Sequence, residues 1–209
     1  MRIVDLTETI RAGMPVYPGD PAVRIERVAS LEADGFTVHR LELNSQVGTH
    51  VETQLHMLPG RRLEDEPLER FIGEAAVVDV PLRALTVRDL EPFRSLVESC
   101  PFLLLRSGYR PPADSIDPED QRRARFEAEC AEWMVARGVC LVGIDAFGFD
   151  YGPQFAAHKV FFRHGVLVLE GLRNLEALSG DRVQLFVIPL KLAEVESSPC
   201  RAFALVKGG

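Results

Sequence analysis

Short apolar runs, and segments in which apolar and polar residues alternate, are spread along the whole chain. Runs of this length, bounded by glycine, proline or acidic residues, are typical of β-strands, whose side chains point alternately to opposite faces. The pattern predicts strands at residues 3–6, 23–29, 36–44, 75–80, 102–106, 139–145, 166–169, 182–189 and 201–206. We therefore expect more strands than helices.

Helical periodicity is clearest in one long segment, from about residue 118 to residue 137. Apolar residues recur there at helical spacing: Phe126, Cys130, Trp133 and Met134. Gly138 follows and is well placed to end a helix, because glycine readily adopts the left-handed conformation found just after helix ends. The sequence therefore predicts one long helix over residues 118–137.

Two shorter helices are also indicated. Thr86 and Asp89 have the spacing of a capping box, and residues 155–163 precede Gly165. Strands mixed with crossover helices imply an α/β fold. A length of 209 residues, without a change of composition along the chain, predicts one domain over residues 1–209.

The overall composition narrows the class of protein. With 46% hydrophobic residues, 26% charged residues and a formal net charge of -7, the chain is typical of a globular protein that does not bind nucleic acid. Residues 1–5 lack the apolar run of a signal peptide, and no segment is apolar enough to span a membrane, so we expect a cytoplasmic protein without a membrane partner. The four cysteines lack CxxC spacing and are expected to be reduced.

Residues 45–56, SQVGTHVETQLH, gather two of the five histidines, a carboxylate and two amides. In an extended strand the even-numbered positions face one side, so His50 and Glu52 could bind one divalent cation. A straight strand would place His56 roughly 20 Å from His50, at about 3.3 Å per residue, so either the chain bends or His56 has another role. A histidine beside a metal suits proton transfer, because its unperturbed pKa is about 6.5.

By itself, this cluster is equally consistent with a metal or catalytic site and with a polar hydrogen-bond network. Two downstream residues could complete a site: His158, and Glu170 at the end of an apolar run. A buried carboxylate is costly unless it is paired or coordinates a cation. The alternatives are that His158 lies on a helix surface and that Glu170 pairs with Arg173. His39 shares the parity of nearby leucines and is expected in the core or behind the site.

The residues from Gly48 to His56 resemble the HxGTHxDxPxH signature of the cyclase family that includes the bacterial kynurenine formamidases. Four further segments resemble family motifs in the same order along the chain: PVYPGD at 15–20, GID at 143–145 with Asp150, His158 followed by EGLRNL at 170–175, and SPCR at 198–201. The resemblance thus covers the whole chain. It implies a mixed β-sheet with flanking helices, of the swivelling β/β/α type, and a homodimer or homotetramer.

The resemblance also implies roles for individual residues. It assigns metal binding to His50, Glu52, His158 and Glu170, acid/base catalysis to His56, and contact with the substrate to Tyr17. Gln46 stands at the first metal position, where the family has histidine, and its neutral amide oxygen would be a weak ligand. The sequence also has Glu52 for aspartate, Gln54 for proline and Gly148 for serine. The implied cofactor is one or two divalent ions, zinc or alternatively manganese.

These implied residues suggest a metal-dependent hydrolase. A divalent cation can lower the pKa of water and polarise a carbonyl, which would cleave a formamide, cyclic amide or ester in a small aromatic or cyclic substrate. His56 would give a proton to the leaving group. Two alternatives stay open at this point. The same centre could promote ring closure in a biosynthetic cyclase or dehydratase, or the chain could be a noncatalytic binding protein on the same fold.

Overall fold

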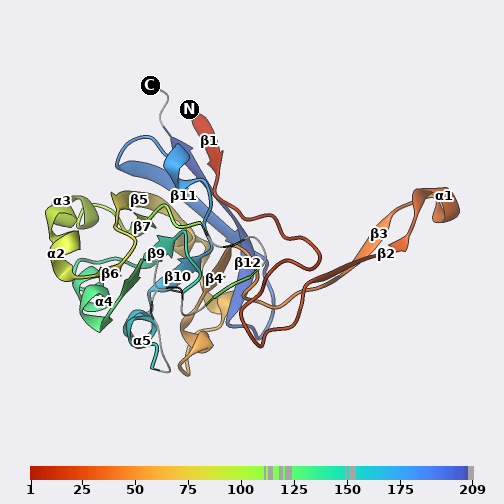
Figure 1. The fold of residues 1–209 in the computed structure, drawn as a ribbon, viewed down its shortest axis with the longest axis horizontal. Coiled ribbons are helices and arrows are strands. Elements are labelled where there is room, and N and C mark those ends of the chain that lie inside the picture. Colours follow the sequence, from red (N-terminus) through yellow and green to blue (C-terminus); the bar gives the residue numbers. More distant parts are fainter. Residues whose placement is uncertain are drawn as a thin grey trace.

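The computed structural model describes residues 1–110, 112, 115–117, 120, 124–148, 150 and 154–206. Its centre is an eight-stranded mixed sheet in the order β1-β12-β11-β5-β7-β9-β10-β4 (Figure 1). The strands of this sheet span Arg2–Asp5 (β1), His50–Glu52 (β4), Ile72–Asp79 (β5), Phe102–Arg106 (β7), Leu141–Ile144 (β9), Leu167–Glu170 (β10), Arg182–Pro189 (β11) and Ser197–Val206 (β12). Strand β4 also pairs with the first residues of β12, so it is held from both sides.

Strands β5, β7, β9 and β10 run parallel and form the most deeply buried part of the sheet. In β7, Phe102 and Leu104 belong to one apolar cluster, whereas Leu103 and Leu105 belong to the cluster on the opposite face. This alternation explains the unbroken apolar run in the sequence, because a parallel strand covered on both faces needs apolar side chains at every position.

Helices cover one face of the sheet (Figure 1). They span Val87–Leu90 (α2), Arg94–Val97 (α3), Ala128–Val135 (α4) and Ala156–Arg163 (α5). Met134 of α4 and Phe161 of α5 pack in the same cluster as Leu103. Short 3-10 helices lie at Gln54–His56 (η1), Leu63–Asp65 (η2), Leu68–Arg70 (η3), Glu91–Phe93 (η4) and Leu175–Ala177 (η5). Among the described residues, no helix is both long enough and apolar enough to cross a bilayer.

The predicted α/β class, with a mixed sheet and flanking helices, is confirmed. Each predicted strand overlaps an observed one, with shifts of a few residues at most ends, and β12 begins four residues earlier than expected. The capping box predicted at Thr86 and Asp89 is present, with Asp89 Oδ2 accepting a hydrogen bond from the Thr86 amide at 2.8 Å. The four cysteines are free thiols.

The long helix predicted over residues 118–137 is wrong in its first half. Helix α4 begins only at Ala128, and Arg125–Phe126 forms strand β8, which pairs with β6 (Ala84–Leu85). Phe126 is buried, as its apolar character indicated, but it lies in a strand, with its ring edge-on to that of Phe161 in α5. Residues 118, 119 and 121–123 of the predicted helix lie outside the described residues.

A β-hairpin projects from the body of the molecule (Figure 1). It consists of β2 (Arg24–Ala29), the short helix α1 (Leu31–Asp34) and β3 (Val38–Glu42), and its two strands pair with each other in a separate sheet. Both strands are exposed on both faces, apart from partly covered Ala29. The expectation that His39 lies in the core or behind the site is therefore wrong, because His39 lies on β3 and every residue of this strand is exposed.

Candidate metal centre

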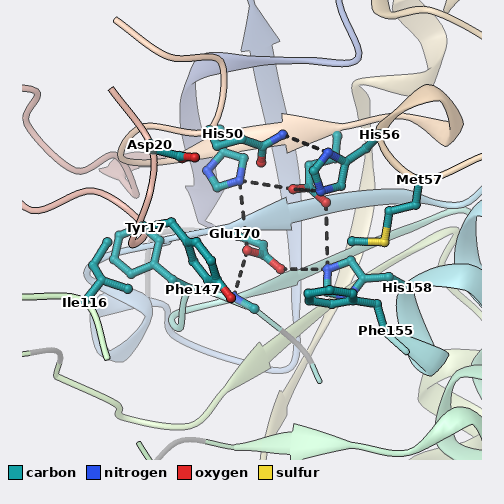
Figure 2. A pocket seen from close by; sticks show the side chains of 13 residues that line it. Tyr17, Asp20, His50, His56, Met57, Ile116, Phe147, Phe155, His158 and Glu170 are labelled. Atoms are coloured by element: carbon teal, nitrogen blue, oxygen red, sulfur yellow. Dashed lines mark hydrogen bonds and ion pairs between the residues drawn. The ribbon is translucent and has the colours of Figure 1, made fainter. Parts of the chain in front are cut away.

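Three segments that are distant in sequence bring their polar side chains together at one end of the sheet (Figure 2). His50 and Glu52 come from β4, Glu170 comes from the end of β10, and His158 comes from the first turns of α5. Strands β4 and β10 are antiparallel neighbours, with Glu170 opposite His50 and Val168 opposite Glu52. Pairing of the two strands therefore fixes the position of the two carboxylates relative to the His50 ring.

Two glycines allow β4 and β10 to approach each other where the site forms. Gly48 and Gly171 both have left-handed backbone angles, with φ of 65° and 68°. A Cβ at position 171 would lie 2.5 Å from the carbonyl oxygen of Gly48, which is too close for any side chain. The hydroxyl of Thr49 ties the two turns together, because it donates a hydrogen bond to the Gly171 carbonyl at 2.7 Å.

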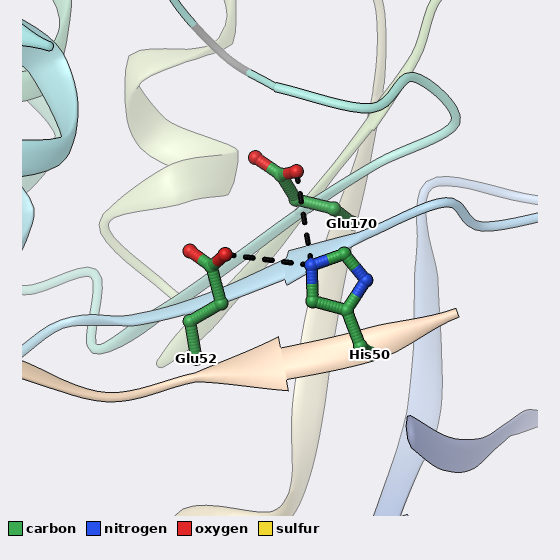
Figure 3. Close-up of side chains that lie close together, drawn as sticks. All are labelled: His50, Glu52 and Glu170. Atoms are coloured by element: carbon green, nitrogen blue, oxygen red, sulfur yellow. Dashed lines mark ion pairs between the residues drawn. The ribbon is translucent and has the colours of Figure 1, made fainter. Parts of the chain in front are cut away.

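The four side chains surround a common point and all are buried. Nε2 of His50 lies 3.4 Å from Oε1 of Glu52 and 3.9 Å from Oε2 of Glu170 (Figure 3). Nε2 of His158 lies 3.1 Å from Oε1 of Glu170 and 3.8 Å from Oε2 of Glu52. His50, Glu52 and Glu170 each offer one ligand atom within 4.8 Å of the others.

The second nitrogen of each histidine faces a hydrogen-bond acceptor. Nδ1 of His50 lies 3.0 Å from the carbonyl oxygen of Gly48, and Nδ1 of His158 lies 2.6 Å from Oδ1 of Asp150. A neutral histidine that donates its Nδ1 proton to such an acceptor presents an unprotonated Nε2, and this is the usual arrangement behind metal-binding histidines. Both Nε2 atoms point at the carboxylates.

Asp150 has a second task at the start of helix α5. Its Oδ2 accepts a hydrogen bond from the amide of Ala157 at 2.7 Å, while Oδ1 faces the His158 ring. One carboxylate thus anchors the helix and orients the histidine that the helix carries. Gly148 contributes from the same loop, because its amide donates to Oε2 of Glu170 at 2.7 Å.

The ionisation of the centre follows from burial and mutual proximity. Burial alone would raise the pKa of Glu52, but the hydrogen-bonding His50 and the nearby His56 and His158 lower it to about 2. Burial would lower the pKa of His50, but its hydrogen bond with Glu52 outweighs this effect and raises the pKa. In the same way, burial would lower the pKa of His158, but its hydrogen bonds with Asp150 and Glu170 raise it. The imidazoles and the carboxylates therefore favour each other's charged forms.

The donor set fits a divalent cation. Oε2 of Glu52 is buried and has no hydrogen-bond partner among the described residues. An unpaired buried carboxylate oxygen is costly, and coordination of a cation removes that cost. Two imidazole nitrogens and carboxylate oxygens are the ligands that zinc and manganese accept.

His56 lies next to this cluster, on the 3-10 helix η1 that follows β4. The chain bends after Glu52, which is one of the two alternatives that the distance argument left open, and Nε2 of His56 lies 3.7 Å from Oε1 of Glu52. The side chain is 26% exposed, in contrast to the buried His50 and His158. His56 therefore reaches both the cluster and the open cavity.

Gln46 lies beside His56. Its Nε2 is 3.2 Å from Nδ1 of His56 and donates hydrogen bonds to the Ser197 hydroxyl at 2.9 Å and to Oε1 of Glu196 at 3.3 Å. With the amide assigned in this orientation, Nδ1 of His56 is the acceptor and its proton is on Nε2. The structure thus gives Gln46 a contact with His56 that the sequence did not indicate.

A cavity of about 410 Å³ opens above the cluster, and its walls include three aromatic side chains of tyrosine and phenylalanine. Tyr17, Phe147 and Ile116 line one side, and Met57 and Phe155 line the side near His158 (Figure 2). The Tyr17 side lies toward solvent, since this residue is 41% exposed. Tyr17 was expected at the site from the sequence, whereas the two phenylalanines were not.

Phe155 has a backbone conformation that is rare for a residue with a side chain. Its φ is 42°, in the left-handed region, at the N-cap of α5. The ring lies edge-on to the His158 ring, with 6.1 Å between the centroids. Such an outlier could not be found from the sequence, because a phenylalanine before a helix normally indicates only packing.

The structure also decides between the alternatives that the sequence left open for individual residues. Glu170 does not pair with Arg173, whose Nε instead lies 2.6 Å from Oε2 of Glu8. His158 is on the inner face of its helix and is buried. Asp145, in the GID segment, caps the loop after β7 by accepting a hydrogen bond from the amide of Gly108 at 2.8 Å.

Comparison with known proteins identifies the family of the chain. The family model Cyclase matches residues 4–151. The chain is 33% identical to a kynurenine formamidase of Erythrobacter litoralis, over 96% of this chain and 92% of the relative. It is 32% identical to a kynurenine formamidase of Paracidovorax citrulli, over 95% and 94% of the two chains.

Solved structures share the fold. A potential metal-dependent hydrolase with cyclase activity is 25% identical, covers 100% of this chain and 99% of its own, and superposes with a TM-score of 0.79. Isatin hydrolase A from Labrenzia aggregata, bound to benzyl benzoate, is 24% identical and superposes with a TM-score of 0.87 over 99% of this chain and 94% of its own. The chain thus shares its fold with these solved structures.

Proposed function

The chain belongs to the Cyclase family, and from this premise we propose that it is a metal-dependent hydrolase of C–N bonds other than peptide bonds. The substrate class that we propose is an aryl formamide or a related cyclic amide. One observation carries the proposal: the buried Oε2 of Glu52, which has no hydrogen-bond partner among the described residues, lies among two histidines and a second carboxylate at the base of a cavity with three aromatic residues in its walls. The relatives named kynurenine formamidase support the choice of bond.

His50, Glu52, His158 and Glu170 would hold the cation. Asp150 and the Gly48 carbonyl fix the two rings so that each Nε2 faces the centre. When bound there, a divalent cation supplies a water of lowered pKa and polarises the amide carbonyl. We propose zinc, with manganese as the alternative, and one ion in the described ligand set; a second ion would need Gln46, whose amide nitrogen faces His56 and Ser197.

His56 would transfer the proton. Its Nε2 carries a proton that lies beside Glu52 and faces the cavity, and Gln46 fixes the opposite side of the ring. Cleavage of an aryl formamide releases an amine, which must take up a proton as the C–N bond breaks. A partly exposed histidine next to the cation can give that proton and regain it from solvent.

The walls of the cavity would select an aromatic substrate. Tyr17, Phe147 and Phe155 surround the space with ring faces and edges. Stacked or edge-on aromatic pairs contribute about 0.5–1.5 kcal/mol beyond the area that they bury. The described residues that line this cavity include no lysine or arginine, so apolar contact dominates the binding of the ring.

Hydrolysis of formanilide and of N-formylkynurenine tests the proposal directly. We expect release of formate from at least one of them, loss of turnover after exhaustive chelation, and recovery after addition of zinc or manganese. Full activity in the chelated protein would overturn the proposal. A cyclase or dehydratase would instead convert an open precursor to a ring without consuming water, which product analysis distinguishes.

For the assembly we propose a homo-oligomer in which the projecting hairpin packs against a second copy. The hairpin exposes Leu31, Phe36 and Leu41, which are 66%, 57% and 59% accessible. An isolated two-stranded hairpin is marginally stable in water, so a partner surface would stabilise it. Light scattering should give a dimer or tetramer for the native chain and a smaller species for Leu41→Asp, with Leu68→Asp, an exposed leucine on η3, as the control.

The four free thiols, three of which are buried, support a reducing compartment, and we propose that the protein is cytoplasmic. We also propose that residues 1–209 form one domain, because a single sheet carries both apolar clusters.

A further inference from the structure

Gln46 carries the one amide side chain among the described residues that line the cavity at the metal centre. Its Nε2 lies 2.9 Å from the Ser197 hydroxyl, 3.2 Å from Nδ1 of His56 and 3.3 Å from Oε1 of Glu196. All three contacts are made by the same end of the amide. The other end therefore has a different environment.

The neighbours of Gln46 decide which end of its amide is nitrogen. Burial would raise the pKa of Glu196, but hydrogen bonds, first among them that from the Ser45 hydroxyl, outweigh this effect and lower it. An ionised carboxylate only accepts hydrogen bonds, so the amide atom beside Glu196 must be the donor. The Ser197 hydroxyl gives its own proton to the carbonyl oxygen of Ser45 at 2.9 Å, so it too accepts from Gln46. The two acceptors thus hold the amide in one orientation.

The oxygen of this amide is free to accept a hydrogen bond. Oε1 of Gln46 bonds to none of the described residues. Gln46 is half-buried, and its Oε1 is not one of the buried side-chain atoms that lack a partner, so solvent reaches it. An amide oxygen has two lone pairs and accepts well. The cavity therefore holds a neutral acceptor of fixed orientation, on the same side chain that contacts His56.

We propose that Oε1 of Gln46 accepts a hydrogen bond from the N–H group of the scissile amide, and that Gln46 thereby selects amides with an N–H over N-substituted amides and esters. This inference rests on the proposed function and narrows its substrates to secondary amides and lactams that carry an N–H. A site that hydrogen-bonds a group of the substrate disfavours an analogue without that group, because the partner in the site is left unpaired. An ester oxygen would also turn its lone pairs toward Oε1.

The same contact favours the reaction step. As the C–N bond breaks, the nitrogen keeps its own hydrogen, takes up a proton from His56 and gains positive charge. The negative end of the Gln46 amide dipole lies toward that nitrogen and stabilises the charge. Gln46 therefore contacts the reacting group with its oxygen and His56 with its nitrogen.

The test compares the hydrolysis of formanilide and N-methylformanilide by the zinc-loaded protein. Both release an aniline that needs a proton from His56, so an effect of a variant on His56 acts on both substrates. Gln46→Met keeps the length of the side chain without the amide. We expect it to lower the ratio of kcat/KM for formanilide to kcat/KM for N-methylformanilide about tenfold, the size of one lost hydrogen bond. Gln184→Met, at a half-buried position on β11 outside the cavity lining, should leave the ratio unchanged.

A second variant changes the support of the amide without changing the cavity lining. In Glu196→Gln the new side chain can offer its own NH2 group, so the Gln46 amide can turn its oxygen away from the cavity. The ratio should fall in this variant, by less than in Gln46→Met because Ser197 still accepts from the amide. Glu194→Gln is the matched control, because Glu194 is 79% exposed in the same segment and does not line the cavity.

Binding measures the contact without turnover. Oxindole and N-methyloxindole are lactams that differ only at the N–H group, and calorimetry gives their affinities for the zinc-loaded protein. We expect the native protein to prefer oxindole, and Gln46→Met to lose about tenfold of that preference. Titration of zinc against a competing chelator should give the same metal affinity for both proteins.

The outcomes separate this contact from the proposed function. An unchanged preference for the N–H compound in Gln46→Met overturns the contact, and a large loss of zinc affinity in that variant overturns it by making Gln46 a metal ligand. A preference for oxindole that depends on Gln46, without turnover of either formanilide, refutes the hydrolase and leaves the contact standing. Turnover of formanilide with the same ratio in native protein and Gln46→Met refutes the contact and leaves the hydrolase standing.

Discussion

The carboxylate of Asp150 lies 2.6 Å from Nδ1 of His158 and, through its other oxygen, caps the helix that carries His158. One side chain therefore sets both the position and the direction of this imidazole. The same dual contact explains how a helix residue is held against two strands at a centre where all the charges are buried.

Replacement of Asp150 by asparagine should weaken cation binding. Asparagine has an NH2 group in place of one oxygen, so a donor would face either the His158 ring or the amide of Ala157. The amide also carries no charge to stabilise the ring. Loss of such a supporting group typically costs 10–100-fold in metal affinity. Zinc titration against a competing chelator measures this, and Asp181→Asn, an exposed position, is the control. Unchanged affinity in Asp150→Asn would contradict the supporting role of Asp150.

Replacement of His56 by alanine should separate catalysis from metal binding. If His56 transfers a proton, kcat should fall by roughly 10²–10⁴-fold. Metal content should remain near that of the native protein, because His56 lies beside Glu52 and outside the four-residue ligand set. His164→Ala, an exposed histidine at the end of α5, should change neither quantity. A large loss of metal in His56→Ala would make this residue a ligand.

Binding of the cation should release protons and strengthen as the pH rises. The pKa values of His50 and His158 are raised by the carboxylates around them, so the metal-free centre retains protons that a cation must displace. Calorimetry in buffers of different ionisation enthalpy counts the released protons. A binding constant that does not change between acidic and mildly basic pH would contradict this account.

The metal-free protein should lose stability as the pH rises, whereas cation binding should strengthen. A histidine whose pKa is raised by folding contributes stability below its unfolded pKa, near 6.5, and loses it as the pH rises through the folded value. The metal-free protein should therefore become less stable above neutral pH, while the metal-loaded protein should not. Urea unfolding of both forms at several pH values measures the difference, and parallel behaviour of the two forms would count against it.

Replacement of Gly171 by alanine should destabilise the fold at the site. The new Cβ would lie 2.5 Å from the Gly48 carbonyl oxygen in a left-handed backbone conformation, and we expect a loss of about 2–4 kcal/mol in the free energy of unfolding. Gly180→Ala is a matched control, because Gly180 also has positive φ but open space around it, so it should lose only about 1–2 kcal/mol. Equal losses would mean that the contact with Gly48 is unimportant.

The sequence by itself was sufficient for the local geometry. Alternation of side chains along a strand placed His50 and Glu52 on one face, and the spacing to His56 indicated either a bend, which η1 provides, or another role for His56. The buried strands could also be predicted. Both faces of β7 are covered, so apolar residues occupy its positions without a break and stand out in the sequence. These features depend on neighbours within a few residues, which a sequence displays directly.

Tertiary structure alone decided how distant segments meet. Pairing of β4 with β10 placed Glu170 beside His50, and helix α5 brought His158 and its partner Asp150 to the same point. Apolar periodicity near Phe126 was misleading because this residue lies in strand β8, which pairs with β6 about forty residues earlier, and His39 was misplaced because every residue of its strand β3 is exposed. Burial is a property of the elements that pack against a residue, and a one-dimensional pattern indicates which side chains can be covered but not what covers them.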